Sequence, residues 1–238
     1  MPEDAVLDKI PALRLDRSRH AAPQVADALR ELIVSLELVP GTVLPRAELA
    51  EHYKISQTPV REALIRLGEE GLLDIFPQHA TVVSRIDIAA AQQAHFLRRA
   101  LELEIIRTLT APDGPDNTAL VQRLRRHMQR QLEAMAPQDY VDFGIADRDF
   151  HREMYEATGH TELWLLVRQR SGHVDRLRRL HLPAEGKTQS VLDDHRALVE
   201  AIEARDTARA EAALRRHLSG TLAFVADIRA RYPAYVSG

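Results

Sequence analysis

The apolar pattern of the chain changes at Ser84, and no other feature of the sequence constrains the fold as strongly. Before Ser84, three segments with helical spacing are followed by two short apolar runs, 72–76 and 80–84, which predict a β-hairpin. From about Asp87 to Arg231 the strand pattern disappears, and short breaks rich in Pro, Gly, Asp or Thr separate six helical segments. The sequence therefore predicts a mainly α protein with two domains, the second an antiparallel six-helix bundle.

The first domain is expected to be a winged helix-turn-helix, because three helices followed by a small hairpin is the order of that fold. Its helices are predicted at 22–38, 46–53 and 59–70. We expect Asp87 to cap the first helix of the bundle, since an Asp side chain accepts hydrogen bonds from the free amides of a first turn. The predicted divisions are an N-terminal tail at 1–17, the winged domain at 18–84, the all-α domain at 85–231 and a C-terminal tail at 232–238.

The composition restricts the chemistry that the chain can use. It contains no cysteine, which excludes disulfides, thiolate catalysis and cysteine-bound zinc. No apolar run is long enough to span a membrane, and the acidic start differs from a signal peptide, so we expect a cytoplasmic protein without a membrane partner. The formal net charge of −3 gives no overall attraction to nucleic acid, so any DNA contact has to be local.

The stretch SQTPVREAL, which begins at Ser56, has the features of a helix entrance that faces a ligand. Ser56 occupies the position of an N-cap, and Pro59 is tolerated in a first turn that has no intrahelical donors to lose. Gln57, Thr58 and Arg61 then project from the start of the helix, where a helix-turn-helix domain contacts bases and phosphates. The alternative is that the stretch only caps a helix and that Arg61 pairs with a neighbouring acid.

From residue 33 to residue 83 the sequence resembles the DNA-binding domain of the GntR family of bacterial transcription regulators. The resemblance is carried by ELAEHYKISQTPVREALIRL and by the predicted wing, PQHATVV. It implies that the chain binds double-stranded operator DNA, with Arg46 and the wing residue His79 as further contacts. Gln57 stands where many members carry arginine, so the operator sequence is expected to differ from theirs.

Four residues of the helical half form a candidate metal site. Asp147 and His151 are four residues apart in DRDFHREMY, so one helix face presents a carboxylate and an imidazole one turn apart. His195 and His217 lie on the last two predicted helices, each with apolar neighbours. Three imidazoles and one carboxylate suit Zn(II), Ni(II), Fe(II) or Mn(II). Spacing alone supports such a site weakly, because Asp/His pairs with this spacing are common on solvated helices.

From Asp87 to about Val225 the sequence is similar to the FCD effector domain, the all-helical module of the FadR branch of GntR regulators. The similarity is carried by FLRRALELEI, DRDFHREMYEATGH, DDHRALVEAIEARD and AEAALRRHL. In metal-binding members the ligands are the Asp and His of D-x-x-x-H, a His that opens the penultimate helix and a His near the middle of the last. The resemblance therefore implies a divalent metal ion held by Asp147, His151, His195 and His217.

The same resemblance implies an effector. A small carboxylate metabolite can bind an open position of the ion while a nearby arginine neutralises its charge. Arg98 and Glu102 match the arginine and the acid of the family pattern R-x-x-L-E and are the expected effector contacts. The alternative for this pair is a salt bridge within one helix, which contributes little.

Two functions follow from these features. The first is a metabolite-responsive transcription regulator, which the resemblance makes a homodimer and a repressor that its effector relieves. The second is a metal-dependent enzyme that acts on a small organic acid and uses the winged domain as an accessory, since an open metal position can activate water. No convincing second catalytic group accompanies the metal candidates, and this favours the regulator.

Overall fold

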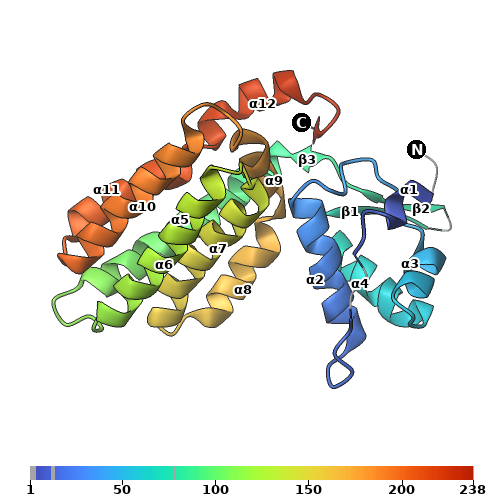
Figure 1. Ribbon diagram of the computed structural model, residues 1–238, viewed down its shortest axis with the longest axis horizontal. Helices are drawn as coiled ribbons and strands as arrows, with labels where there is room; N and C mark the ends of the chain where they lie inside the picture. Colours follow the sequence, from blue (N-terminus) through green and yellow to red (C-terminus); the bar gives the residue numbers. More distant parts are fainter. Residues whose placement is uncertain (1–3, 12–13, 78, 238) are drawn as a thin grey trace.

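The computed structural model describes residues 4–11, 14–77 and 79–237 of the chain. Gln78 of the predicted wing and the outermost residues of both predicted tails lie outside these ranges. Figure 1 shows a smaller N-terminal lobe beside a longer helical lobe. Among the described residues, no helix combines the length and the apolar character that a membrane span requires.

After a short first helix, the N-terminal lobe has the predicted order of three helices and a hairpin. Its elements are α1 (Asp4–Leu7), α2 (Ala21–Val34), α3 (Arg46–His52), α4 (Gln57–Glu69), β1 (Leu73–Phe76) and β2 (Ala80–Val83). The two strands pair antiparallel, with Leu73 opposite Val83 and Phe76 opposite Ala80. The helix predicted to run to residue 38 ends at Val34, because Leu36 turns the backbone with φ 65°.

Apolar residues at helical spacing form the core of this lobe. Leu29 and Ile33 of α2 are fully buried and belong to one cluster with Val60, Leu64 and Leu67 of α4. Each such side chain contributes roughly 1.5–3 kcal/mol when it leaves water. The first and third predicted helices therefore pack as one unit. The short helix α1, which was not predicted, adds its buried Val6 to the same core.

The helical lobe follows the predicted breaks, with two refinements. Its elements are α5 (Ile88–Thr110), α6 (Thr118–Met135), α7 (Tyr140–Ala157), α8 (Thr161–Arg170), α9 (Gly172–His181), α10 (Lys187–Glu203), α11 (Thr207–Ser219), the short 3₁₀ helix η1 (Leu222–Phe224) and α12 (Val225–Arg231). The fourth predicted segment is divided at Ser171 into α8 and α9, and the sixth into α11, η1 and α12. The Asp87 side chain accepts a hydrogen bond from the Ala90 amide at 3.1 Å, which confirms the predicted cap.

The C-terminal segment forms a strand that the sequence did not predict. β4 (Val236–Ser237) pairs in parallel with β3 (Ile86–Asp87), and the Ile86 amide donates to the Tyr235 carbonyl at 2.7 Å. The expectation that strands end at Ser84 was therefore wrong. A two-residue strand leaves no alternation to detect, because it is shorter than the period-2 pattern requires.

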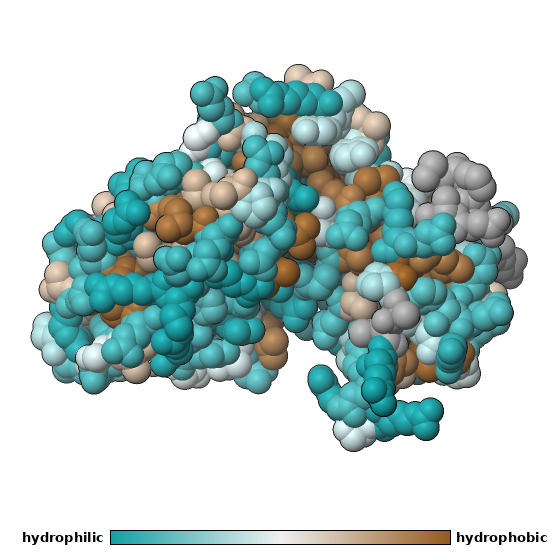
Figure 2. Space-filling view, viewed as in Figure 1, coloured by the Kyte–Doolittle hydropathy of each residue, from teal (hydrophilic) through white to brown (hydrophobic). Residues whose placement is uncertain are grey.

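Helix α9 forms the joint between the lobes. Arg176 is fully buried and its Nη1 donates to the Ser84 carbonyl at 2.7 Å. The Asp87 amide donates to Nδ1 of His173 at 3.0 Å. A Cβ on Gly172 would lie 2.6 Å from Leu72, so the absence of a side chain lets the N-terminal lobe pack against the start of α9. Figure 2 shows a mainly hydrophilic surface with hydrophobic residues gathered around the middle of the molecule.

Candidate metal centre

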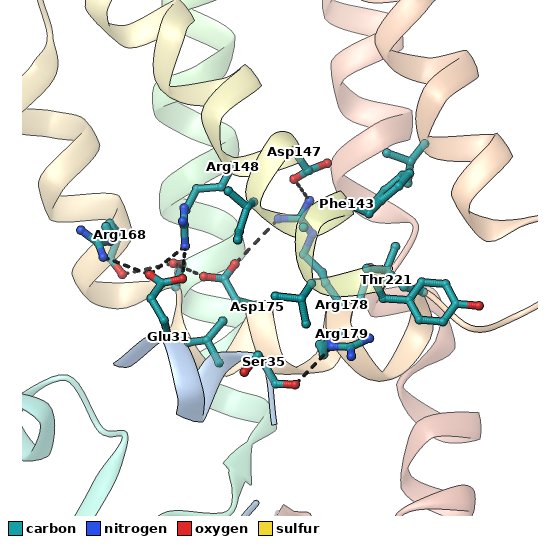
Figure 3. Close-up of a pocket in the computed structure, with 18 of the residues that line it drawn as sticks. Glu31, Ser35, Phe143, Asp147, Arg148, Arg168, Asp175, Arg178, Arg179 and Thr221 are labelled. Atoms are coloured by element: carbon teal, nitrogen blue, oxygen red, sulfur yellow. Dashed lines mark hydrogen bonds and ion pairs between the residues drawn. The ribbon is translucent and has the colours of Figure 1, made fainter. Parts of the chain in front are cut away.

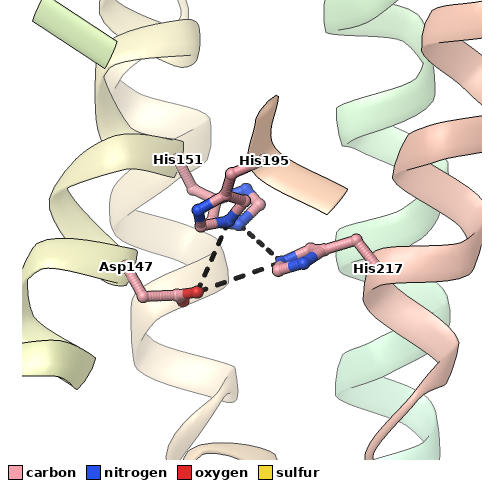
Figure 4. A group of neighbouring side chains, drawn as sticks. All are labelled: Asp147, His151, His195 and His217. Atoms are coloured by element: carbon pink, nitrogen blue, oxygen red, sulfur yellow. Dashed lines mark hydrogen bonds and ion pairs between the residues drawn. The ribbon is translucent and has the colours of Figure 1, made fainter. Parts of the chain in front are cut away.

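The four predicted ligands come together in the helical lobe. Asp147 and His151 lie on α7, His195 on α10 and His217 on α11. All four side chains are buried, and their ligand atoms lie within 4.8 Å of one another. Figure 4 shows the four side chains pointing toward one another from their three helices.

The distances within the cluster suit a shared ion. His151 Nε2 lies 3.0 Å from His217 Nε2, and Asp147 Oδ1 lies 3.5 Å from His195 Nε2 and 4.0 Å from His217 Nε2. Ligand atoms bound at about 2.1 Å to one ion are separated by about 3 Å when adjacent and by about 4.2 Å when opposite. These three separations fall within that interval.

Two buried acceptors from other helices fix the orientation of two of the imidazoles. His195 Nδ1 lies 2.8 Å from Gln131 Oε1, and His151 Nδ1 lies 2.8 Å from Glu102 Oε2. A carboxylate or amide oxygen only accepts, so each Nδ1 carries the proton and each Nε2 presents its lone pair to the cluster. Metal-ligating histidines have the same arrangement, in which the second ring nitrogen donates to an outer oxygen.

The electrostatics of the cluster keep the imidazoles neutral and the carboxylate charged. Burial lowers the pKa of His195 to about 3 and that of His217 well below its usual range. Burial also opposes ionisation of Asp147, but the positive charge of Arg178 holds the pKa of this carboxyl well below normal. Neutral imidazoles and an ionised carboxylate are the protonation states that a metal requires.

Two ligand atoms are buried without a hydrogen-bond partner among the described residues, namely Asp147 Oδ1 and His195 Nε2. Native proteins seldom leave buried polar atoms unpaired. An oxygen lone pair and a nitrogen lone pair facing each other repel unless a cation or a proton lies between them. The residues present therefore fit a divalent ion.

A cavity of about 400 Å³ opens from the cluster toward the N-terminal lobe. Asp147 and His217 line it together with the basic residues Arg98, Arg178 and Lys187. Arg178 pairs with Asp147 Oδ2, as Figure 3 shows. A cavity of this size accommodates a small organic molecule.

Of the two expected effector contacts, only Arg98 lines this cavity within the described part of the chain. Glu102 is fully buried, with Oε1 2.6 Å from Arg98 Nε and Oε2 against His151. Its carboxylate therefore orients a predicted metal ligand and a cavity arginine. The salt bridge within one helix, which was the alternative for this pair, is present in α5 and is buried.

Sequence reasoning did not identify Gln131 or Arg178. Gln131 lies seven residues after the buried Leu124, on the apolar face of α6, so a polar residue at an apolar position was the available signal. Arg178 lies in RLRRLH, where several arginines are equivalent in the sequence and only the packing of α9 selects one.

The predicted DNA contacts lie together on the N-terminal lobe. Gln57, Thr58 and Arg61 are exposed at the start of α4, and Arg46 is exposed at the start of α3. Pro59 is the third residue of α4 and is half-buried, and His79 is exposed in the turn of the hairpin. Ser56 occupies the N-cap position with extended backbone, but its side chain makes no capping hydrogen bond, so that part of the prediction was wrong.

Comparison with known proteins places the chain in a family. Residues 93–220 match the family model described as the FCD domain, and residues 21–83 match the one described as bacterial regulatory proteins, gntR family. A transcriptional regulator of the helix-turn-helix type from Streptomyces ambofaciens is 37% identical over 205 residues, which are 86% of this chain and 85% of the relative. The chain belongs to the GntR family of bacterial regulatory proteins.

Other similarities agree with this family. The transcriptional repressor RspR of Escherichia coli is 27% identical over 216 residues, which are 91% of this chain and 93% of RspR. The structure of E. coli McbR/YncC has the same fold, with a TM-score of 0.73, 22% identity and coverage of 89% of this chain and 98% of McbR/YncC. This GntR protein is therefore a transcriptional regulator and not an enzyme. Its helix-turn-helix domain implies DNA binding, and its FCD domain implies a small-molecule effector.

Proposed function

We propose that this GntR protein is a repressor whose helical domain holds a divalent metal ion and binds a small carboxylate that changes its affinity for operator DNA. The ion is held by Asp147, His151, His195 and His217. One observation carries the proposal: buried acceptors fix the Nδ1 protons of two histidines, so that their Nε2 lone pairs, together with Asp147 Oδ1, face one small volume.

The cavity beside the cluster supports a carboxylate effector. A bound ion would supply an open position for an anionic oxygen. Arg98 and Lys187 bring positive charge to the same cavity, and Arg178 already holds a carboxylate there. Arginine binds carboxylates with two parallel hydrogen bonds, which favours an organic acid over a neutral molecule. Glu102 keeps Arg98 and His151 in position and does not contact the effector.

The N-terminal lobe would read the operator. Gln57, Thr58 and Arg61 enter the major groove from the start of α4, where helix-turn-helix proteins contact base edges. Ser56, Pro59, Arg46 and His79 lie beside the DNA. We assign operator binding to residues 18–84 and effector binding to residues 85–231. Repression is supported by relatives that are repressors, among them RspR and the gluconate operon repressor of Bacillus subtilis.

A homodimer with two winged lobes would match a pseudo-palindromic operator, because operator symmetry mirrors protein symmetry. The protein would act in the cytoplasm, where the bacterial DNA lies. An effector changes operator affinity only if it binds one arrangement of the lobes more tightly than the other.

Metal content tests the site directly. Purified wild type, His217→Ala and the control His127→Ala should be compared by elemental analysis after dialysis against trace Zn²⁺. His127 lies on α6, contacts Glu153 at 3.3 Å and is not one of the four clustered residues. Wild type and His127→Ala should hold about one ion per chain, and His217→Ala should lose most of it, because a lost ligand leaves too few donors.

Circular dichroism establishes that each variant is folded, and His195→Ala provides a second ligand variant if His217→Ala does not fold. Equal metal content in folded wild type and folded ligand variants would refute the proposed site.

A further inference from the structure

A carboxylate of the DNA-binding lobe lies in the effector cavity of the helical lobe. Glu31 of α2 accepts two hydrogen bonds from Arg148 Nη1, at 2.8 Å to Oε1 and 2.6 Å to Oε2. Arg168 Nη2 donates to Oε1 at 3.1 Å. All three residues line the same cavity as Asp147 and His217. Figure 3 shows Glu31 reaching from α2 between the two arginines.

This contact has the chemistry of a carboxylate-binding site. Two guanidinium groups converge on one carboxylate, and proteins recognise carboxylate ligands in this way. Burial opposes ionisation of Glu31, but the positive charge of Arg148, followed by that of Arg168, leaves its pKa below normal. An ionised side chain of one lobe thus occupies an anion site of the other.

Glu31 lies on α2, which packs against α4, the helix that is proposed to contact DNA. The neighbouring residues Leu29 and Ile33 are fully buried in the core that α2 shares with α4. A force on Glu31 is therefore transmitted to α4, because tightly packed helices shift together instead of deforming. Arg148 follows the proposed ligand Asp147 on α7, so the arginine pair and the metal centre face one cavity from adjacent positions.

We propose that Arg148 and Arg168 form a second carboxylate subsite of the effector, which Glu31 occupies until the effector arrives. The effector is then a dicarboxylate. One carboxylate binds at the inner end, beside Arg178 and Lys187, and the other replaces Glu31 between the two arginines. This inference rests on the proposed function of the cavity and adds the class of effector and the way it releases α2.

The exchange is electrostatically balanced, since one carboxylate replaces another on the same two cations. The two arginines, which are half-buried, keep an anionic partner throughout. Glu31 moves into water when it is displaced, and a carboxylate is well solvated there.

Calorimetric titration of the Zn²⁺-loaded full-length protein tests the inference. The probes are the linear dicarboxylates from malonate to adipate, with acetate and butyrate as monocarboxylates. Wild type is compared with Glu31→Gln and with the matched control Glu37→Gln, which removes the same charge from an exposed residue lining the same cavity. Glu31→Gln should bind the preferred dicarboxylate about tenfold more tightly, because it removes a competing charged acceptor.

Three further results are expected. Glu37→Gln should leave both dicarboxylate binding and acetate binding as they are in wild type. Arg168→Gln should weaken dicarboxylate binding while leaving acetate binding unchanged. Amide hydrogen exchange of the ligand-free protein should be faster in α2 of Glu31→Gln than in α2 of Glu37→Gln, because the Glu31 carboxylate links α2 to Arg148 of α7.

The outcomes separate the two proposals. If acetate binds but Glu31→Gln binds dicarboxylates no more tightly than Glu37→Gln does, the second subsite is refuted and the proposed function stands. Unchanged exchange in α2 of Glu31→Gln would also refute it. If no carboxylate binds any of the proteins, the proposed effector site and the second subsite both fail.

Discussion

Single buried polar side chains determine how the candidate metal centre is built. Gln131 on α6 and Glu102 on α5 each hold the Nδ1 of one imidazole, so two helices that carry no ligand control where two Nε2 atoms point. The spacing of Asp147 and His151 was sufficient to predict that they share a helix face. No spacing rule connects Gln131 to His195, because the contact joins residues that are 64 positions apart.

Gln131→Ala should weaken metal binding without abolishing it. The ring of His195 would lose the acceptor that fixes its tautomer, and loss of such an outer contact typically costs about 10–100-fold in metal affinity. Competition with a chelator of known affinity measures the change. Gln129→Ala, an exposed residue of the same helix, serves as the control. If both variants bind metal as wild type does, the role assigned to Gln131 is wrong.

Arg61→Ala should weaken operator binding by about 1–3 kcal/mol, because an arginine fork on a base edge or phosphate contributes about that much. Fluorescence anisotropy at fixed salt measures the affinity. Arg66→Ala changes the same residue type at the other end of α4, where Arg66 lies 3.6 Å from Glu70. Equal losses in the two variants would count against α4 entering the groove by its N-terminal end.

At the scale of whole elements, the sequence predicted helices and the hairpin well where local signals mark their ends. Pro, Gly and Asp between apolar segments gave the breaks on either side of α6, α7 and α10, and Asp87 gave the start of α5. The division between α8 and α9 was not predicted because its cause is tertiary. Gly172 receives Leu72 of the other lobe, and Ser171 Oγ donates to the Arg168 carbonyl at 3.1 Å, which competes with the helix.

Gly71 in the turn after α4 can be compared with Gly159 in the turn after α7. Gly71 and Gly159 both have φ +76°, but a Cβ on Gly71 would lie 2.9 Å from His173 Nε2, whereas a Cβ on Gly159 would meet nothing within 4 Å. Gly159→Ala should cost about 1–2 kcal/mol from its left-handed backbone alone. Gly71→Ala should cost more in urea unfolding, since it also displaces the His173 ring. If the two variants lose equal free energy of unfolding, displacement of the His173 ring costs nothing and this explanation is wrong.

On the scale of the whole molecule, the contact between the lobes was the least predictable part. The pairing of β3 with β4 and the contact of Glu31 with Arg148 join segments more than 100 residues apart, and neither leaves a periodic trace in the sequence. The existence of two lobes was evident from the change of pattern at Ser84. Their relative placement depends on buried contacts of α9 with residues 71, 72 and 84, which only the folded chain brings together.

Stability should fall in mild acid because of the histidine at this joint. Burial, and then the nearby charge of Arg176, lowers the pKa of His173 to about 4 from an ordinary 6.5. The unfolded chain therefore binds more protons between these values, so the stabilisation is complete above pH 6.5 and is lost as the pH falls toward 4. The protonated ring could no longer accept a hydrogen bond from the Asp87 amide.

The loss attributable to His173 is up to about 3 kcal/mol. Calorimetric unfolding at a series of pH values, for wild type and His173→Gln, measures it. The two curves should run parallel above pH 7, and the wild-type curve should fall more steeply between pH 6.5 and 4. Identical slopes in acid would show that the ring titrates equally in the folded and unfolded chains.

Helix α9 carries Arg176, which holds the Ser84 carbonyl, and Arg178, which pairs with Asp147. These two residues are about 3 Å apart along the helix axis. Because the two residues lie within one helical turn, a shift of α9 that moves one arginine also moves the other. A genetic selection for strains that the effector no longer induces should therefore recover substitutions along α9. Such variants should still bind the effector and still bind the promoter DNA, but effector binding should no longer change the affinity for that DNA.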